Sequence, residues 1–173
     1  LMEYSQKNSV PLLARGGGSS QCGQTVGESV VLDYSKHQNK ILELNVEEKY
    51  VWVQPGVVLD HLNDYLKPYG LWFPVDVSTS SRATIGGMSA NNSCGSRSLY
   101  YGNMVHNVLA IEAILDDGSI FNFDQINKNY LATKNNQDRL YKIIDKFIDV
   151  RQKVGSEIDA NWPTTQRRVG GYN

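Results

Sequence analysis

The sequence has few cysteines and no long apolar run, and each shortage excludes a class of protein. Its 173 residues include two cysteines, too few for a disulfide framework or a four-cysteine zinc site. No apolar stretch approaches the roughly 20 residues that a membrane-spanning helix needs. The first ten residues also lack the apolar centre of a signal peptide. We therefore expect a reduced, cytoplasmic protein, with peripheral contact at the inner membrane as a variant of that location.

Charge of one sign is not in excess either. Lys and Arg number 17 and Asp and Glu 18, which gives a formal net charge of -1. Nucleic-acid-binding domains carry a basic patch or stripe, so no nucleic-acid partner is expected. The three histidines show no spacing typical of metal ligands, and no metal is expected. Hydrophobic residues make up 40% of the chain, which is enough for a globular core.

Hydrophobic periodicity predicts an α+β chain. Short apolar or alternating runs predict strands at residues 10–14, 29–33 and 50–54, and residues 71–75 are expected to be extended. Residues 108–115 and 119–123 predict a hairpin with Asp117-Gly118 at its turn. Helical spacing predicts a helix from residue 57 to a C-cap at Gly70, and an amphipathic helix over residues 138–154. Since the first strand comes without a preceding element to pair with, we expect the chain to be a fragment.

Three successive glycines are the first feature with a chemical implication. They stand in the run Arg-Gly-Gly-Gly-Ser-Ser, residues 15–20, directly after the first predicted strand. Glycines let several backbone N–H groups line one concave side, and such a nest binds phosphate oxygens. A plain flexible linker is the alternative. Neither common nucleotide motif is present, because Gln21 replaces the third glycine of a Rossmann fingerprint and Gln24 the lysine of a Walker A loop.

A second glycine-rich segment, residues 83–95, contains Gly86-Gly87 followed by small residues. This composition predicts a short helix that packs closely against a flat or extended neighbour, and such packing without any ligand is the alternative. Hydroxyl-rich residues 78–81 precede the segment, and Tyr101-Gly102 follows it. No Ser–His–Asp order and no carboxylate pair stands out, so the region is better suited to holding an anionic ligand than to acid–base chemistry.

In this order, the motifs resemble the FAD-binding domain of the vanillyl-alcohol oxidase / p-cresol methylhydroxylase (PCMH) type. The resemblance covers about residues 10–125 and rests on residues 11–20, 53–56, 73–76, 83–87, 91–95, 101–102 and 116–118. Within that type, the chain is similar to the FAD-linked oxidase group, which includes D-lactate dehydrogenases and glycolate oxidase subunits.

The resemblance implies a fold and a domain plan. The fold would be α+β of the PCMH type, with a small parallel β/α part, an antiparallel sheet with helices, and truncation at both ends. Residues 1–35 would be the remainder of the first FAD-binding subdomain and residues 36–125 the second. Residues 126–173 would form a helix and a connector toward a substrate domain. Catalytic residues normally lie in that domain of the family, so none is assigned to this chain.

The resemblance also implies which residues contact FAD. The pyrophosphate would be held by Gly16, Gly17, Gly18, Ser19 and Ser20. The diphosphate and ribityl chain would be lined by Val77, Ser78, Thr79, Thr84, Ile85, Gly86 and Gly87. The pocket would be completed by Asn92, Ser93, Gly95 and Gly102. Binding is expected to be non-covalent, because Ser19 stands where family members with covalent flavin often carry histidine.

As a function, the resemblance implies a FAD-dependent oxidoreductase acting on CH–OH groups. The expected substrate is a 2-hydroxy acid such as D-lactate or glycolate, with an unknown electron acceptor, and the chain alone is expected to be inactive. Two alternatives stay open: a non-enzymatic nucleotide- or phosphate-binding module, and a same-fold flavoenzyme such as an aromatic alcohol oxidase or a cell-wall precursor reductase. Exposed strand edges would allow a homodimer.

Overall fold

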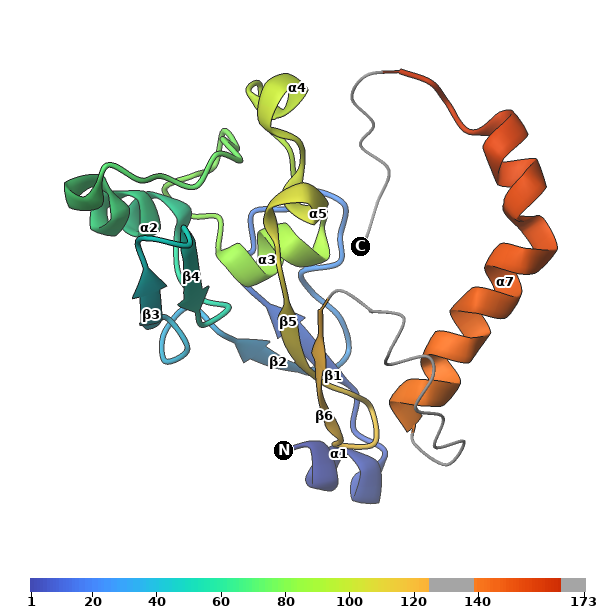
Figure 1. The fold of residues 1–173 in the computed structure, drawn as a ribbon. Coiled ribbons are helices and arrows are strands. Elements are labelled where there is room, and N and C mark those ends of the chain that lie inside the picture. Colours follow the sequence, from blue (N-terminus) through green and yellow to red (C-terminus); the bar gives the residue numbers. More distant parts are fainter. Residues whose placement is uncertain (125–138, 166–173) are drawn as a thin grey trace. The chain divides into compact units, whose positions relative to one another are not determined.

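The computed structural model describes residues 1–124 and 139–165, which Figure 1 draws as a coloured ribbon. These residues fall into two compact units. The first unit contains Leu1–Val108 and the second lies within Leu109–Arg168. In the described residues, helices and three two-stranded sheets confirm the predicted α+β class. The domain limits at residues 35 and 125 stay a prediction. No helix in these described ranges is long and apolar enough to cross a membrane.

The first unit begins with helix α1 (Met2–Asn8), which the sequence analysis did not predict. Glu3 lies in the first turn of α1 and Lys7 in the last, which suits the helix dipole. Ser9 ends the helix in the left-handed region at φ 53°. The N–H of the next residue, Val10, donates to the carbonyl of Ser5 at 3.0 Å. The sequence of α1 is mostly polar, so it has little hydrophobic periodicity from which the helix could be predicted.

Strands β1 (Leu12–Arg15) and β2 (Val30–Asp33) pair in parallel, with Leu13 opposite Val31. Parallel strands need a crossover of about a dozen residues or more, and residues 16–29 supply it. The three glycines therefore start the crossover at the carboxyl end of β1. Within the described residues β1 and β2 pair only with each other. Pairing of a second copy along their outer edges stays a prediction.

A second layer combines β3 (Ile41–Asn45), β4 (Tyr50–Val53), helix α2 (Leu59–Leu66) and the 3-10 turn η1 (Lys67–Tyr69). The buried side chains Leu62 and Leu66 of α2 pack on apolar residues of both strands, among them Leu44 and Val51. Gly70 closes the turn at φ 69°, as predicted. The sequence did not predict β3, because a bulge near its start breaks the alternation of apolar residues.

Helices α3 (Ile85–Ala90), α4 (Ser98–Tyr101) and α5 (Met104–Asn107) complete the first unit. Met88 of α3 and Met104 of α5 form a core with Leu59 and Val75. The short helix predicted after Gly86-Gly87 is thus confirmed. Residues 71–75 are not part of a strand, although Val75 is fully buried.

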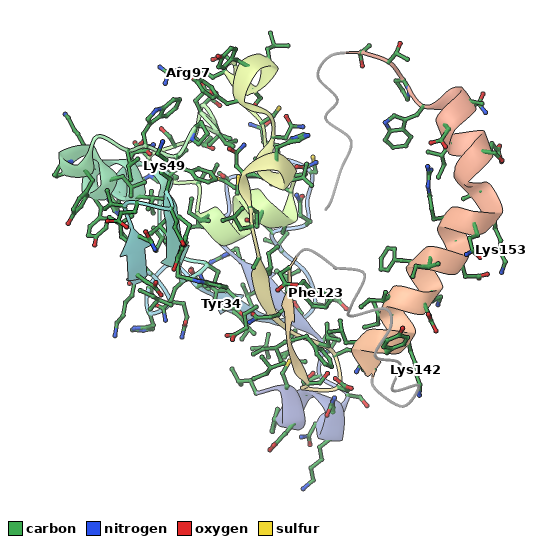
Figure 2. The ribbon with its side chains drawn as sticks, viewed as in Figure 1. Tyr34, Lys49, Arg97, Phe123, Lys142 and Lys153 are labelled. Carbon is green, nitrogen blue, oxygen red and sulfur yellow. The ribbon has the colours of Figure 1, made fainter. Side chains whose placement is uncertain are left out.

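The second unit contains the hairpin of β5 (Ile111–Ile114) and β6 (Ile120–Phe123), and helix α7 (Arg139–Asn161). Gly118 turns the hairpin at φ 82°, as predicted. Arg139 at the start of α7 pairs with the carboxylates of Asp116 and Asp117 at this turn. The helix continues beyond residue 154, where we expected it to end. Lys153, labelled in Figure 2, pairs one turn back with Asp149 at 2.7 Å.

Candidate cofactor-binding site

The glycine loop, residues 16–20, leaves β1 with main-chain N–H groups that have no acceptor. In the part of the chain that the structure describes, no hydrogen bond is donated by the N–H of Gly16, Gly17, Gly18 or Ser19. The last three of these residues are exposed, and Gly18 adopts a positive φ of 64°. Unpaired N–H groups on an exposed, glycine-bearing turn are suited to the oxygens of an anion.

The glycine loop lies directly against the segment that leads into α3. A β-carbon on Gly16 would lie 2.1 Å from Oγ1 of Thr84, and one on Gly17 would lie 2.2 Å from the carbonyl oxygen of Arg82. Both distances are far below van der Waals contact. The fold therefore brings the first predicted group of FAD-contacting residues to the second, and it requires glycine at positions 16 and 17 to do so.

The N-terminus of α3 uses its main-chain N–H groups inside the protein. Ile85 donates to the carbonyl of Val57 (2.8 Å) and Gly86 to that of Pro55 (2.9 Å). Thr84, which is 1% exposed, caps the helix by accepting the N–H of Gly87 at 3.4 Å. This segment can line a ligand with its surface, but its first turn offers fewer free donors than the glycine loop.

Residues 77–79 form the turn that leads to this segment. Val77 packs against the core, whereas Ser78 and Thr79 are exposed. The carbonyl of Thr79 accepts the N–H groups of Arg82 (2.8 Å) and Ala83 (2.7 Å). Ser78 and Thr79 are therefore accessible to a ligand, whereas Val77 contributes to the packing of the core.

The third predicted group lies around α5. Asn92 accepts the N–H of Val105 through Oδ1 at 3.1 Å, and the carbonyl of Ser93 accepts that of Met104 at 3.0 Å. Gly102 has a φ of 79° and closes α4. The hydrogen bonds attach Asn92 and Ser93 to the start of α5, and Gly102 lies in the short connection between α4 and α5. They place the group beside the turn that follows α3, and none of them reaches the glycine loop.

Gly95 is tied to a residue that the sequence analysis did not assign to the site, Asp76. A β-carbon on Gly95 would lie 2.1 Å from both the carbonyl oxygen and Oδ1 of Asp76. The Asp76 carboxylate accepts from the hydroxyl of Ser96 (2.7 Å) and the N–H of Arg97 (3.0 Å), and Arg97 is labelled in Figure 2. Partial burial raises the pKa of Asp76, but these hydrogen bonds outweigh it and leave the pKa below its ordinary value.

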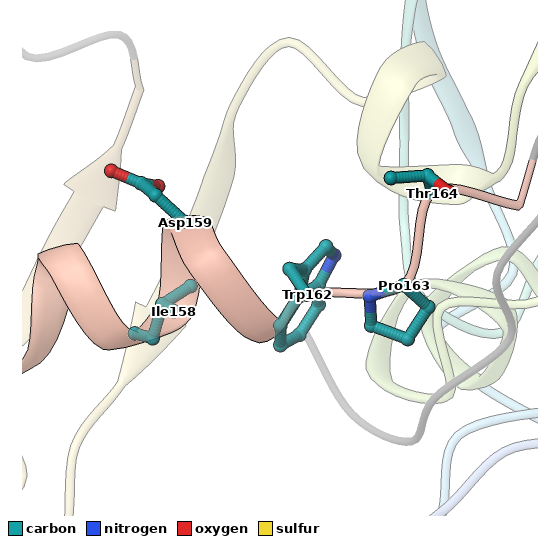
Figure 3. A pocket seen from close by; sticks show the side chains of 5 residues that line it. All are labelled: Ile158, Asp159, Trp162, Pro163 and Thr164. Carbon is teal, nitrogen blue, oxygen red and sulfur yellow. The ribbon is translucent and has the colours of Figure 1, made fainter.

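A hollow at the end of α7 contains none of the predicted residues. Its lining is shown in Figure 3 and comprises Ile158, Asp159, Trp162, Pro163 and Thr164. These are one carboxylate, one hydroxyl and three apolar side chains of the second unit. Neither a row of N–H donors nor a cluster of titratable groups accompanies them, so we do not assign the cofactor to this hollow.

Residues 1–124 match the family described as FAD binding domain, and the chain belongs to this family. It is 43% identical over 127 residues to D-2-hydroxyglutarate dehydrogenase of Haemophilus influenzae, covering 73% of this chain. It is 37% identical over 177 residues to the Escherichia coli enzyme of that name, covering 100% of this chain. It is also 40% identical over 124 residues, 69% of this chain, to the mitochondrial D-lactate dehydrogenase [cytochrome] of Kluyveromyces lactis.

The chain spans only 12% and 17% of the two D-2-hydroxyglutarate dehydrogenases, and 21% of the D-lactate dehydrogenase. Two solved structures share the fold at low identity. Carbohydrate oxidase from Microdochium nivale has a TM-score of 0.64 at 22% identity, covering 78% of this chain and 27% of that one. For 6-hydroxy-D-nicotine oxidase from Arthrobacter nicotinovorans the TM-score is 0.63 at 18% identity, covering 71% and 26%. The predicted family, its fold and its cofactor, FAD, are confirmed.

The residues present fit the pyrophosphate of FAD. The glycine loop provides exposed N–H groups without acceptors and carries no acidic side chain. The carboxylate of Asp33 at the end of β2 is paired with Arg15 at 3.2 Å. Near the loop, Oε1 of Gln24 is buried without a hydrogen-bond partner among the described residues. The sequence analysis did not assign Gln24 or Asp76 to the site, although Asp76 lies in the segment 73–76 that contributes to the family resemblance.

Proposed function

We propose that this chain forms the FAD-binding part of a flavin-dependent oxidoreductase that oxidises the CH–OH group of a D-2-hydroxy acid. The observation that carries the proposal is the row of unpaired N–H groups on the glycine loop, held against the segment before α3. Membership of the FAD binding domain family and the names of the relatives support it.

The residues of this chain would bind and orient the cofactor. The N–H groups of Gly16, Gly17, Gly18 and Ser19 would hold the pyrophosphate, since backbone donors suit an anion that carries negative charge on several oxygens. The exposed hydroxyls of Ser78 and Thr79 would face the same ligand. When bound, the flavin supplies the redox chemistry, by taking up two electrons from the alcohol carbon, and the protein tunes it. Groups that bind the substrate are expected outside this chain.

D-2-hydroxyglutarate is the substrate that we propose first. From the sequence, D-lactate or glycolate was the expected substrate. Relatives named D-lactate dehydrogenase and glycolate oxidase subunit GlcD also match this chain. The four relatives named D-2-hydroxyglutarate dehydrogenase, however, match up to 100% of this chain at 35% to 43% identity. The three compounds share the 2-hydroxy acid group, and they differ in the substituent on the reacting carbon.

The test is dye reduction by the complete gene product that contains this chain. It is assayed with D-2-hydroxyglutarate, D-lactate and glycolate, and with the L-enantiomers of the first two as controls. We expect the fastest reduction with D-2-hydroxyglutarate. Loss of dye reduction in all five assays, in a protein that shows flavin absorbance, would overturn the 2-hydroxy acid proposal and favour a same-fold enzyme of other specificity. A colourless protein that binds other nucleotides would favour the non-enzymatic alternative.

We further propose that FAD is bound non-covalently. Ser19 has no imidazole for attachment, and His106 is engaged by the N–H of Asn103, which donates to its Nδ1 at 3.0 Å. Acid precipitation of the gene product is expected to release yellow flavin into the supernatant. Colour that stays with the precipitate would contradict this.

A further inference from the structure

The side chain of Gln24 contacts the last residue of the glycine loop. Its Nε2 donates to Oγ of Ser20 at 2.6 Å, and the N–H of Cys22 donates to the same oxygen at 3.4 Å. Gln24 and Ser20 are half-buried, in contrast to the exposed residues 17–19. The Gln24 side chain thus holds the hydroxyl of Ser20, the last residue of the glycine loop, by a hydrogen bond.

This arrangement decides what the Ser20 hydroxyl can offer. A hydroxyl oxygen accepts through two lone pairs and donates through one proton. Because Gln24 and Cys22 occupy the accepting sites, the proton is the group that Ser20 has left to give. Within the described residues no acceptor takes it.

The side-chain oxygen of Gln24 indicates that this residue is not the most stabilising one for the fold at its position. Oε1 is buried and has no hydrogen-bond partner among the residues described. A buried polar atom without a partner destabilises a fold, and an apolar side chain of similar size would avoid this cost. The amide at this position therefore requires another explanation, and its contact with Ser20 provides one.

We propose that Gln24 is a positioning residue for the FAD pyrophosphate, which makes the Ser20 hydroxyl a donor toward the phosphate oxygens. This inference rests on the proposed FAD-binding function. The hydroxyl would add a charge-assisted hydrogen bond to those from the N–H groups of the glycine loop. Gln24 itself would act through Ser20 and would not contact the reacting atoms.

The experiment compares three variants of the complete gene product: Gln24→Leu, Gln24→Glu, and Gln21→Leu as the matched control. Gln21 is an exposed glutamine of the same crossover, so its replacement makes the same chemical change without touching Ser20. Each apoprotein is titrated with FAD and with riboflavin, which lacks phosphate, by flavin fluorescence. The melting temperature of each apoprotein is measured alongside.

We expect Gln24→Leu to weaken FAD about 10-fold, the loss of roughly one hydrogen bond to a charged group. Riboflavin affinity and the melting temperature of the apoprotein should stay unchanged, or the latter should rise, since the unpaired oxygen is gone. Gln24→Glu should weaken FAD further, because its carboxylate accepts the Ser20 proton and repels the phosphates. Gln21→Leu should bind FAD like the wild type.

A double-mutant cycle with Ser20→Ala separates positioning from a general role in loop structure. If Gln24 acts through Ser20, Gln24→Leu has no further effect on FAD affinity in the Ser20→Ala background. Additive losses, equal losses for riboflavin, or wild-type affinity of Gln24→Glu would each overturn the inference. Failure of the wild-type protein to bind FAD would instead overturn the proposed function, so the two failures are distinguishable.

Discussion

Two glycine-rich segments lie against each other in the first unit, and their main chains are used in opposite ways. The glycine loop leaves the N–H groups of residues 16–19 without acceptors in the described structure. In the first turn of α3, Ile85 and Gly86 donate to carbonyls of the connection between β4 and α2, and Gly87 donates to the Thr84 side chain. The first segment is therefore available to a ligand, whereas the second is occupied by the fold.

The comparison shows that glycine content alone does not identify a phosphate site. Gly86 is required because a β-carbon there would lie 2.4 Å from Cβ of Pro55, which is a packing requirement. Gly17 has a similar steric requirement against Arg82, but its N–H stays unpaired. Where each N–H donates is the property that separates a ligand-binding segment from a structural one.

Replacement of Gly17 by valine tests the binding side of the comparison and should have the largest effect. Its side chain would meet the Arg82 carbonyl and push the loop off the segment before α3. Loss of two charge-assisted hydrogen bonds, at roughly 1.5–3 kcal/mol each, would weaken FAD about 10²- to 10⁴-fold. Flavin titration of the gene product measures this, and wild-type affinity would refute the assignment of the glycine loop.

The reason for this prediction is steric and does not involve a positive φ. Within the glycine loop the positive φ, 64°, belongs to Gly18 and not to Gly17. A suitable control is Gly27→Ala, because a β-carbon on Gly27 would meet only ordinary contacts at 3.7 Å or more. Gly23 is unsuitable, since its φ of 85° would strain any replacement.

Replacement of Gly86 by valine tests the structural side. The added side chain would overlap Pro55, whose Cα and carbonyl oxygen also lie within 3.0 Å of the new β-carbon. Overpacking of this kind costs about 1–3 kcal/mol, and we expect the upper part of that range because main-chain atoms must move. Urea unfolding of the apoprotein measures the loss. Ala90→Val, on an exposed position of the same helix, should cost less than about 1 kcal/mol.

If Gly86→Val kept its unfolding free energy but lost FAD affinity, the two segments would not differ as described. The first turn of α3 would then serve the ligand directly. Equal stability losses for Gly86→Val and Ala90→Val would likewise contradict the packing argument.

The elements that sequence analysis predicted correctly have strong local signals. Gly70 after a helical pattern and Asp117-Gly118 between two apolar runs each fix a turn by backbone conformation, and the structure shows positive φ at both glycines. The glycine loop belongs to the same class. Strand β3 was not predicted because its bulge puts Ile41 and Leu42 in succession, which hides the period of two.

The site was predictable only in part, because its remaining features depend on contacts between distant residues. Thr84 meets Gly16 across 68 positions of sequence, and Asp76 accepts from Arg97 across 21. No composition or spacing indicates such pairs in a single sequence. The hydrogen bond of Gln24 to Ser20 spans four residues, but glutamine has no turn or cap preference that would indicate it.

The smallest expected effect concerns how the glycine loop is anchored at its start. Arg15, the residue before it, pairs with Asp33, and Ser35 donates to Asp33 from its hydroxyl (2.6 Å) and its N–H (2.9 Å). The hydrogen bonds from Ser35, and then that from Arg15, lower the pKa of Asp33 from 3.8 to about 2. Arg15 is thereby engaged by a carboxylate, and the loop depends on its N–H groups for binding an anion.

The sign of the pH dependence follows from this lowered pKa. A carboxyl group whose pKa is lower in the folded state stabilises the fold above its unfolded pKa of about 4, and this contribution is lost as the pH falls toward 2.

An NMR titration of the Asp33 carboxyl carbon should therefore have its midpoint near 2 in the wild type. Ser35→Ala and Arg15→Ala should each move the midpoint toward 3.8, because each variant removes a hydrogen bond that lowers the pKa. An Asp33 that titrates near 3.8 in the folded wild type, or an Arg15→Ala variant in which the midpoint does not move, would show that Arg15 is not held in this way. Arg15 would then be a cation available to the phosphates, and the contrast between the two glycine segments would need a charged side chain in addition to the free N–H groups.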